Sequence, residues 1–320
     1  MGPGSLSPLA LFGPTASGKT ALAIALAQRL GGVIINADSL QVYEACPTLT
    51  ARPDGEEMAA ADHRLYGFLP ETEKMNVARW LNLAKIEAQR VRDDGKLPIF
   101  CGGTGFYLKA LEEGLSAIPA VEPDILIAAD ARLEALGPEA FEQEVFAADP
   151  DLQPQFEAKD RQRLLRAWSV WQGTGRPLSY WQAQPKQGGV GRLRSFVLLP
   201  DRQALYRRIN QRFATMLGQG AGEEVAEVAA RTREQGLYPL ELPLAQALGF
   251  KELLATQEAG IALAQAQDRA SQVSRNYAKR QLTWARNQSL NAIKLPYNQI
   301  SKQQIKNLCD LIIAFMSQKA

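Results

Sequence analysis

Residues 13–20 read Gly-Pro-Thr-Ala-Ser-Gly-Lys-Thr and match the pattern G-x-x-x-x-G-K-[ST], which restricts the fold of this chain more than any other stretch. A short apolar run, residues 9–12, precedes the pattern, and an alanine-rich helical stretch from about Lys19 to Leu30 follows it. In that context the glycines let several backbone N–H groups point into one hollow, and the helix N-terminus adds positive potential. The pattern therefore predicts a loop that binds a diphosphate or a triphosphate, without saying which.

The side chains of this loop also suggest how the phosphates are held. We expect Lys19 to contact them as a point charge and Thr20 to hold Mg²⁺. An enzyme that hydrolyses ATP usually has a further apolar strand ending in an acidic residue, whereas the third apolar run here ends in Gly102-Gly103-Thr104. The nearest acidic residue is Asp38, a position that some small-molecule kinases also use, so a kinase remains a competing interpretation. The expected phosphate-binding residues are Gly13, Thr15, Ala16, Ser17, Gly18, Lys19 and Thr20.

Apolar runs that alternate with helical stretches predict an α/β fold with a parallel sheet. The runs at residues 33–36, 97–101 and 196–199 are continuous, as in strands buried on both faces, while residues 77–93 have helical spacing. From about residue 122 to residue 180 the pattern predicts helices only. We therefore predict an α/β core formed by residues 1–117 and 193–320, with an all-helical domain inserted at residues 118–192.

Composition excludes several classes of function. The chain has 36 basic and 34 acidic residues, so any nucleic acid must bind through local basic patches. Its three cysteines, Cys46, Cys101 and Cys309, are far apart and fit a reducing compartment better than a disulfide framework or a zinc site. A single histidine, His63, argues against a histidine-rich metal cluster. The sequence also has no long apolar run and no signal-peptide pattern, so we expect a cytoplasmic protein without a membrane or an obligate protein partner.

Several separate blocks resemble the tRNA dimethylallyltransferase family. Besides residues 13–20, the blocks are residues 36–43 (NADSLQVY), 101–107 (CGGTGFY), 160–167 (DRQRLLRA), 174–179 (TGRPLS), 201–202 (DR), 208–213 (RINQRF), 248–252 (LGFKE) and 277–284 (YAKRQLTW). They occur in the family's order over roughly residues 9–290. The resemblance implies a P-loop nucleotide-kinase-like core with a helical insertion. It also implies transfer of a dimethylallyl group from dimethylallyl diphosphate to N6 of adenine 37 in the tRNA anticodon loop, with Mg²⁺ as cofactor.

The same resemblance assigns roles to three residues. It implies that Asp38 is the hydrogen-bond acceptor and general base for N6, because a carboxylate can take a proton as that nitrogen becomes positive. Thr104 matches the residue that contacts the bridging oxygen of the diphosphate. Arg212 matches the arginine that binds the diphosphate, for which a guanidinium offers a bidentate grip. Structural alternatives for these residues are a helix cap or Mg²⁺ ligand for Asp38, a helix cap for Thr104 and a solvated charge for Arg212.

We expect the RNA to be held by side chains that follow Asp38 and by two basic helical faces. The enzyme must reach one amine of a stacked base, so the adenine is expected to be flipped out and read on its edge. Tryptophans beside the basic faces are expected to be core residues more often than stacking platforms. The candidate tRNA-binding residues are Ser39, Leu40, Gln41, Arg161, Gln162, Arg163, Arg166, Gln246, Lys251, Lys279, Arg280 and Trp284.

The chain departs from the family pattern at a few positions. Leu126 stands where an arginine is frequent, and Arg64 replaces the second histidine of a pair. Leu49 and Arg52 replace the glycine and the lysine of a Gly-Thr-Ala-Lys-Pro stretch. We expect these departures to affect RNA contacts more than the chemistry. Besides a kinase, an adenylate isopentenyltransferase acting on free AMP and an RNA-binding protein without activity remain alternatives.

Overall fold

The computed structural model describes residues 7–155, 160–288, 292–298 and 301–317. The chain divides into two compact units. Unit 1 comprises residues 1–112 and 190–320, and unit 2 comprises residues 113–189. Unit 2 is therefore an insertion into unit 1, between the helix Gly105–Glu113 and the strand Arg194–Pro200.

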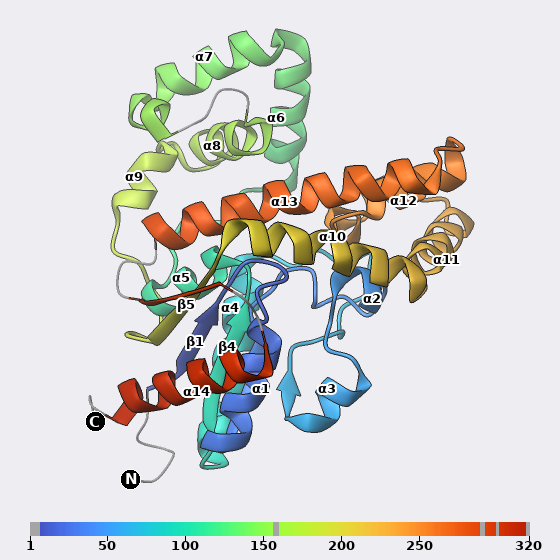
Figure 1. The fold of residues 1–320 in the computed structure, drawn as a ribbon. Coiled ribbons are helices and arrows are strands. Elements are labelled where there is room, and N and C mark those ends of the chain that lie inside the picture. The colour runs from blue at the N-terminus through green and yellow to red at the C-terminus, as the bar shows by residue number, and fades with distance from the viewer. Residues whose placement is uncertain (1–6, 156–159, 289–291, 299–300, 318–320) are drawn as a thin grey trace. The chain divides into compact units, whose positions relative to one another are not determined.

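Unit 1 is built on one six-stranded sheet in the order β3-β2-β4-β1-β5-β6 (Figure 1). The strands are β1 (Leu9–Phe12), β2 (Gly32–Asn36), β3 (His63–Arg64), β4 (Leu97–Gly102), β5 (Arg194–Pro200) and β6 (Ile293–Tyr297). Every strand pair is parallel, with Leu9 opposite Ile99 on one side and opposite Arg194 on the other. The predicted α/β class is confirmed, and the four predicted strands are present. The strands β3 and β6 at the two edges were not predicted.

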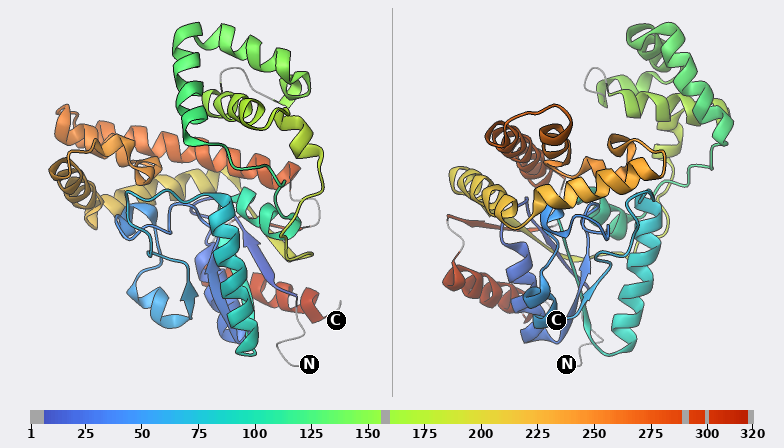
Figure 2. Two further views of the ribbon diagram at one scale, coloured as in Figure 1. Left: turned by 180° about the vertical axis from the view of Figure 1, so that it is seen from behind. Right: turned by 90° about the vertical axis from the view of Figure 1, so that its right-hand side faces the viewer.

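Helices cover both faces of this sheet (Figure 2). The helices α1 (Lys19–Leu30) and α14 (Lys302–Ser317) pack against one face, where their apolar side chains share a core with those of β1, β4 and β5. On the other face, α4 (Val77–Asp93) inserts the fully buried Trp80, whose ring stacks on Tyr107 of α5 (Gly105–Glu113) at 4.4 Å between centroids. The indole N–H of Trp80 donates to the carbonyl of Asn36 at 2.9 Å, which fixes the end of β2. The predicted helix at residues 77–93 is confirmed at both ends.

Two long helices of unit 1, α10 (Arg202–Gly218) and α13 (Leu263–Asn287), pack against each other (Figures 1 and 2). Their buried residues Leu205, Ile209, Ala278 and Leu282 enclose Ala16 of the phosphate-binding loop. The loop at the carboxyl end of β1 is thus covered by α10 and α13. Ligands of open α/β sheets bind at the carboxyl ends of the strands. The smaller elements nearby are α2 (Pro47–Thr50), α3 (Gly55–Ala60), α11 (Ala221–Glu234), α12 (Phe250–Glu258) and the 3₁₀ turns Pro239–Glu241 and Pro243–Gln246.

Unit 2 consists of the helices α6 (Pro123–Leu136), α7 (Pro138–Ala148), α8 (Arg161–Thr174) and α9 (Leu178–Ala183), with a 3₁₀ turn at Pro150–Gln155. It has its own core, in which Phe141 and Trp168 lie 6.2 Å apart between ring centroids. The prediction that residues 122–180 form helices without strands holds for the described part of this range. In both units, each described helix is too short or too polar to cross a lipid bilayer.

Candidate functional site

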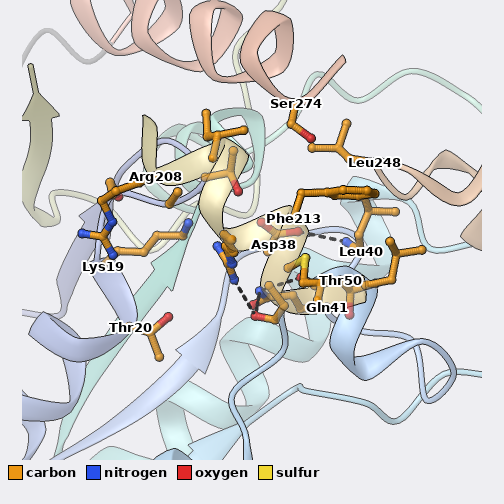
Figure 3. A pocket seen from close by; sticks show the side chains of 18 of the residues that line it. Lys19, Thr20, Asp38, Leu40, Gln41, Thr50, Arg208, Phe213, Leu248 and Ser274 are labelled. Atoms are coloured by element: carbon orange, nitrogen blue, oxygen red, sulfur yellow. Dashed lines mark hydrogen bonds between the residues drawn. The ribbon is translucent and has the colours of Figure 1, made fainter. Parts of the chain in front are cut away.

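A cavity of about 370 Å³ lies within unit 1, beside the phosphate-binding loop (Figure 3). This volume is in the range of pockets that hold small ligands. Its walls come from the loop itself, the segment after β2, α2, α3, α10 and α13. Figure 3 shows Lys19, Thr20 and Arg208 on one side of Asp38, with Phe213 and Leu248 on the other. The pocket is therefore cationic toward one end and apolar toward the other.

The phosphate-binding loop has the conformation that its glycines predicted. Gly18 has a φ of 80°, in the left-handed region that glycine tolerates, and even Ala16 has a φ of 61°. A Cβ on Gly13 would lie 2.5 Å from Oγ of Ser17, so only glycine fits there. The Ser17 hydroxyl is buried and has no hydrogen-bond partner among the described residues. A buried donor without a partner is expected where a ligand oxygen belongs.

Lys19 is buried beside this loop. Burial lowers the pKa of its ammonium group, and the nearby carboxylate of Asp38 opposes that shift. The ammonium donates to the carbonyl of Pro14 at 3.4 Å. An anionic ligand in the cavity would stabilise the charged form of Lys19 and offset the cost of its desolvation.

Asp38 is oriented by its own backbone and by Asn36. The Asn36 side chain accepts a hydrogen bond from the backbone N–H of Asp38 at 2.8 Å and donates to its carbonyl at 3.0 Å. One carboxylate oxygen of Asp38 accepts from the backbone N–H of Leu40 at 3.1 Å. Asp38 lines the cavity, so this network presents a fixed carboxylate to whatever occupies it.

Thr104 belongs to the loop after β4 and reaches the same region through side-chain contacts. Its hydroxyl oxygen accepts from the backbone N–H of Ser39 at 3.1 Å, and its hydroxyl donates to Oγ of Ser39 at 3.4 Å. Tyr277 of α13 lies near this hydroxyl, and its side chain lines the cavity. Burial raises the pKa of the Tyr277 phenol above its usual range. The predicted residues Asp38 and Thr104 are thus brought to one site from two loops.

Two arginines of α10 face the cavity one helical turn apart. Burial lowers the pKa of both Arg208 and Arg212. Arg212 donates to the carbonyl of Ala51 at 3.4 Å, whereas Nη1 of Arg208 is buried without a hydrogen-bond partner among the described residues. Sequence reasoning singled out Arg212 but missed Arg208. The available signal was their four-residue spacing, which places both on one face of a helix.

The apolar end of the cavity is lined by side chains of α2, α10 and the turn before α12. Its apolar lining consists of Leu49, Ile209, Phe213, Met216, Ala247 and Leu248. Leu49 takes the place of a family glycine, but its φ is not in the left-handed region; the positive values fall at Cys46 and Ala51, which flank it. The departure therefore adds an apolar side chain to the wall without straining the backbone.

Among the expected RNA-contacting residues of unit 1, Leu40 and Gln41 line the cavity, and Ser39 contacts Thr104 as described above. The Gln41 amide donates to the carbonyls of Thr50 and Ala51 at 3.1 and 2.7 Å. Trp284 packs on Phe12 at 4.8 Å between ring centroids and against the bare face of Gly105. That position is typical of a core residue. The remaining candidates in this unit, Gln246, Lys251, Lys279 and Arg280, are exposed.

The candidates in unit 2 all lie on the first half of α8. Arg161 pairs with Asp130 at 2.6 Å, and Arg163 pairs with Asp160 at 3.1 Å. Gln162 and Arg166 are exposed. Trp168 is buried and donates to Glu144 at 2.8 Å, which agrees with its expected place in the core. Two of the departures lie on surfaces: Arg64 pairs with Asp62 at 2.9 Å, and Leu126 is 45% exposed.

The residues present fit a magnesium ion that is held chiefly by its ligand. No group of three or more histidine, cysteine, aspartate or glutamate side chains occurs within the described ranges. Thr20 lines the cavity next to the buried, unpartnered hydroxyl of Ser17, and Asp38 lines it as well. Mg²⁺ usually takes one or two protein oxygens and completes its shell with phosphate oxygens and water, which this set of hydroxyls and one carboxylate allows.

Comparisons with known proteins agree with this site. The family model described as "IPP transferase" matches residues 41–288, and the model described as "Isopentenyl transferase" matches residues 8–68. The chain is 43% identical over 310 residues to a protein of Rhodospirillum centenum called "tRNA dimethylallyltransferase", covering 96% of this chain and 97% of the relative. A protein of the same description from Sinorhizobium medicae is 43% identical over 285 residues, covering 88% and 92%.

Two solved structures have similar folds. The full-length tRNA isopentenylpyrophosphate transferase from Bacillus halodurans gives a TM-score of 0.69 at 27% identity and covers 98% of each chain. A eukaryotic dimethylallyltransferase acting on tRNA gives a TM-score of 0.85 at 24% identity, over 99% of this chain and 81% of that chain. At that identity the second likeness supports the fold alone.

Proposed function

Because this chain belongs to the tRNA dimethylallyltransferase family, we propose that its cavity transfers a dimethylallyl group from dimethylallyl diphosphate to N6 of adenine 37 in a tRNA anticodon loop. The observation that carries this proposal is the order of groups along one cavity. Buried cations and a phosphate-binding loop lie at one end, apolar side chains at the other, and the fixed carboxylate of Asp38 between them. Such an order fits a diphosphate joined to a short hydrocarbon, with the reacting carbon near the carboxylate.

The reaction is a displacement at carbon 1 of the donor. The N6 lone pair forms a C–N bond as the C–O bond to the diphosphate breaks, and a proton passes from N6 to the Asp38 carboxylate. The Leu40 N–H donates to one oxygen of that carboxylate, and the Asn36 side chain fixes the Asp38 backbone, so these hydrogen bonds occupy only one of the two carboxylate oxygens. Correct placement of a base contributes typically 10²–10⁴-fold to a rate.

Departure of the diphosphate requires that its growing negative charge be stabilised. The buried Lys19 and the partly buried Arg208 and Arg212 supply three cations, whose interaction with phosphate oxygens is stronger there than in water. The Thr104 hydroxyl is assigned to the bridging oxygen. Thr20 and the phosphate oxygens would hold Mg²⁺, which when bound neutralises part of the leaving-group charge. The apolar wall from Leu49 to Leu248 keeps water from the allylic carbon.

The tRNA is assigned to the mouth of this cavity and to exposed basic helix faces. Ser39, Leu40 and Gln41 directly follow the base and can read the edge of a flipped adenine. Lys279, Arg280 and Lys251 in unit 1, and the arginines of α8 in unit 2, supply phosphate contacts from exposed positions. Gln162 and Gln246 are exposed hydrogen-bonding groups beside them.

A transfer assay tests this function directly. The protein is mixed with Mg²⁺, dimethylallyl diphosphate and an unmodified anticodon stem-loop carrying A36-A37, with parallel reactions on AMP and on ATP plus a small acceptor. The expected result is a mass gain of one dimethylallyl group on the RNA, and none on a stem-loop with guanine at position 37. Prenylation of AMP alone would assign the chain to an adenylate isopentenyltransferase activity, and ATP turnover without prenyl transfer would assign it to a kinase activity.

Replacing the proposed base gives the sharpest single-residue test. Asp38→Asn retains an oxygen that can accept the Leu40 N–H, so the loop keeps its geometry while the base is lost. We expect kcat to fall by about 10²–10⁴-fold, with little change in stem-loop affinity. The measurement is single-turnover transfer together with a binding titration. An Asp38→Asn enzyme with nearly full kcat would remove the base assignment while leaving the overall activity in place.

A further inference from the structure

Gln281 on the inner face of α13 joins two loops of the site that are far from it in sequence. Its side chain is buried, with 5% exposure. The amide oxygen accepts from the backbone N–H of Thr15 in the phosphate-binding loop at 2.9 Å, and the amide nitrogen donates to the carbonyl of Gly103 at 2.8 Å. One primary amide thus satisfies a donor of one loop and an acceptor of the other.

The space around this bridge is closely fitted. A Cβ placed on Gly103 would lie 2.4 Å from the Gln281 amide nitrogen, 3.3 Å from a carboxylate oxygen of Asp38 and 3.4 Å from the carbonyl of Gly13. The glutamine, the base and the start of the phosphate-binding loop therefore converge on one glycine. A side chain at Gly103 would collide with the Gln281 amide, which occupies that space.

The same helix face contacts the site at a second point. Tyr277, one turn before Gln281, lies near Thr104 of the loop after β4, and its side chain lines the cavity. Between them, Ala278 packs in the cluster that encloses Ala16 of the phosphate-binding loop. The helix α13 thus contacts both loops through its buried face, while Lys279 and Arg280 are exposed.

We propose that Gln281 is a positioning residue, which sets the distance between the loop that holds the diphosphate and the loop that carries Thr104. It touches neither substrate. By fixing both loops to one helix, it keeps carbon 1 of the donor in line between its leaving oxygen and N6 of the adenine. This inference rests on the proposed function, because it concerns the geometry of that reaction. A misplacement of about 1 Å is enough to slow an aligned reaction by about 10²-fold.

Gln281→Met tests the role with a side chain of similar length that lacks the amide. We expect kcat for prenyl transfer to fall by about 10²-fold, because the two loops lose their common partner. We also expect the dissociation constant for the stem-loop to stay unchanged, because the exposed face of α13 is intact. Gln272→Met on the same helix is the matched control, since Gln272 is exposed and its described hydrogen bonds, to Asn276 and from Arg275, both stay within α13. Its kcat is expected to equal that of the unaltered protein.

Gln281→Glu separates positioning from simple loss of stability. An ionised glutamate keeps an acceptor for Thr15 but cannot donate to Gly103, whereas a protonated glutamic acid can do both. The ratio of the Gln281→Glu rate to the unaltered rate should therefore rise as the pH falls. Gln281→Met, which introduces no carboxyl near Asp38, is compared at the same pH values.

The outcomes distinguish this inference from the function on which it rests. If the unaltered protein prenylates no RNA, the proposed function fails whatever Gln281 does. If the unaltered protein is active and Gln281→Met has the same kcat per folded molecule, the positioning role is wrong, even if its melting temperature is lower. A Gln281→Glu ratio that does not change with pH would likewise contradict the hydrogen bond to Gly103 as the basis of the effect.

Discussion

The arginines of α10 and those of α8 differ in their surroundings, although the sequence presents both as charged helix faces. Arg208 and Arg212 line the cavity of unit 1, where burial lowers the pKa of each guanidinium. Glu57 and Asp38 oppose that shift at Arg212, but no described carboxylate forms an ion pair with either arginine. Arg161 and Arg163 of unit 2 are exposed and paired with aspartates. A partly buried cation that forms no ion pair costs stability, which an anionic ligand can restore. An exposed pair costs little and can exchange its partner for phosphate.

Among these arginines, the largest effect is expected from Arg212. Arg212→Met keeps the length of the side chain and removes the guanidinium, leaving the diphosphate without one buried partner. Loss of one partner from a buried charge pair costs about 2–5 kcal/mol, so we expect kcat/KM for the donor to fall by about 30- to 4,000-fold. Steady-state kinetics with varied dimethylallyl diphosphate measure it. Arg207→Met, an exposed arginine on the same helix, is the control and should keep the unaltered kcat/KM.

Replacing Arg208 should raise the stability of the ligand-free protein and lower its affinity for the donor. Arg208→Met removes a partly buried cation whose Nη1 atom is buried and has no hydrogen-bond partner among the described residues. We expect the Tm of the ligand-free protein to rise by about 2–4 °C, equivalent to about 1 kcal/mol, while donor affinity falls. Thermal unfolding with and without pyrophosphate measures both. If the ligand-free protein loses stability instead, Arg208 has a structural role and the contrast between the two helices is weakened.

Local motifs explain why much of this site was predictable from the sequence. The phosphate-binding loop, Asp38 and the glycine-rich turn with Thr104 each lie directly after a strand, and parallel strands bring their carboxyl ends to one edge of the sheet. Arg208, Tyr277 and Gln281 were not predicted as site residues. They arrive on helices more than 180 residues after the loop in the chain, and helical spacing shows which residues share a face but not what that face meets.

The edge strand β6 was missed for a similar reason. Its sequence, Ile-Lys-Leu-Pro-Tyr, is short, half-exposed and contains a proline, all of which weaken a strand prediction. It becomes a strand by pairing with β5, where Leu295 lies opposite Leu198. Its last residue then contributes to the site, because the Tyr297 hydroxyl donates to the carbonyl of Ser17 in the phosphate-binding loop. The strand β6 therefore forms because of its pairing with β5 and not because of its own sequence preference.

The smallest effect is expected on α8, where the two partners of one ion pair should act in opposite directions. Arg161→Ala removes one exposed phosphate contact, so stem-loop affinity should weaken about two- to threefold and the salt slope should decrease by about one. Asp130→Ala frees Arg161 from its 2.6 Å partner and should tighten binding by a similar factor. Binding titrations of the anticodon stem-loop between about 50 and 200 mM salt measure both changes. Equal and opposite shifts would assign this face to RNA because the aspartate competes with phosphate for the same guanidinium. If neither substitution changes affinity or slope, the ion pairs of α8 are only a solvated helix surface, and RNA binding depends on the basic residues of unit 1.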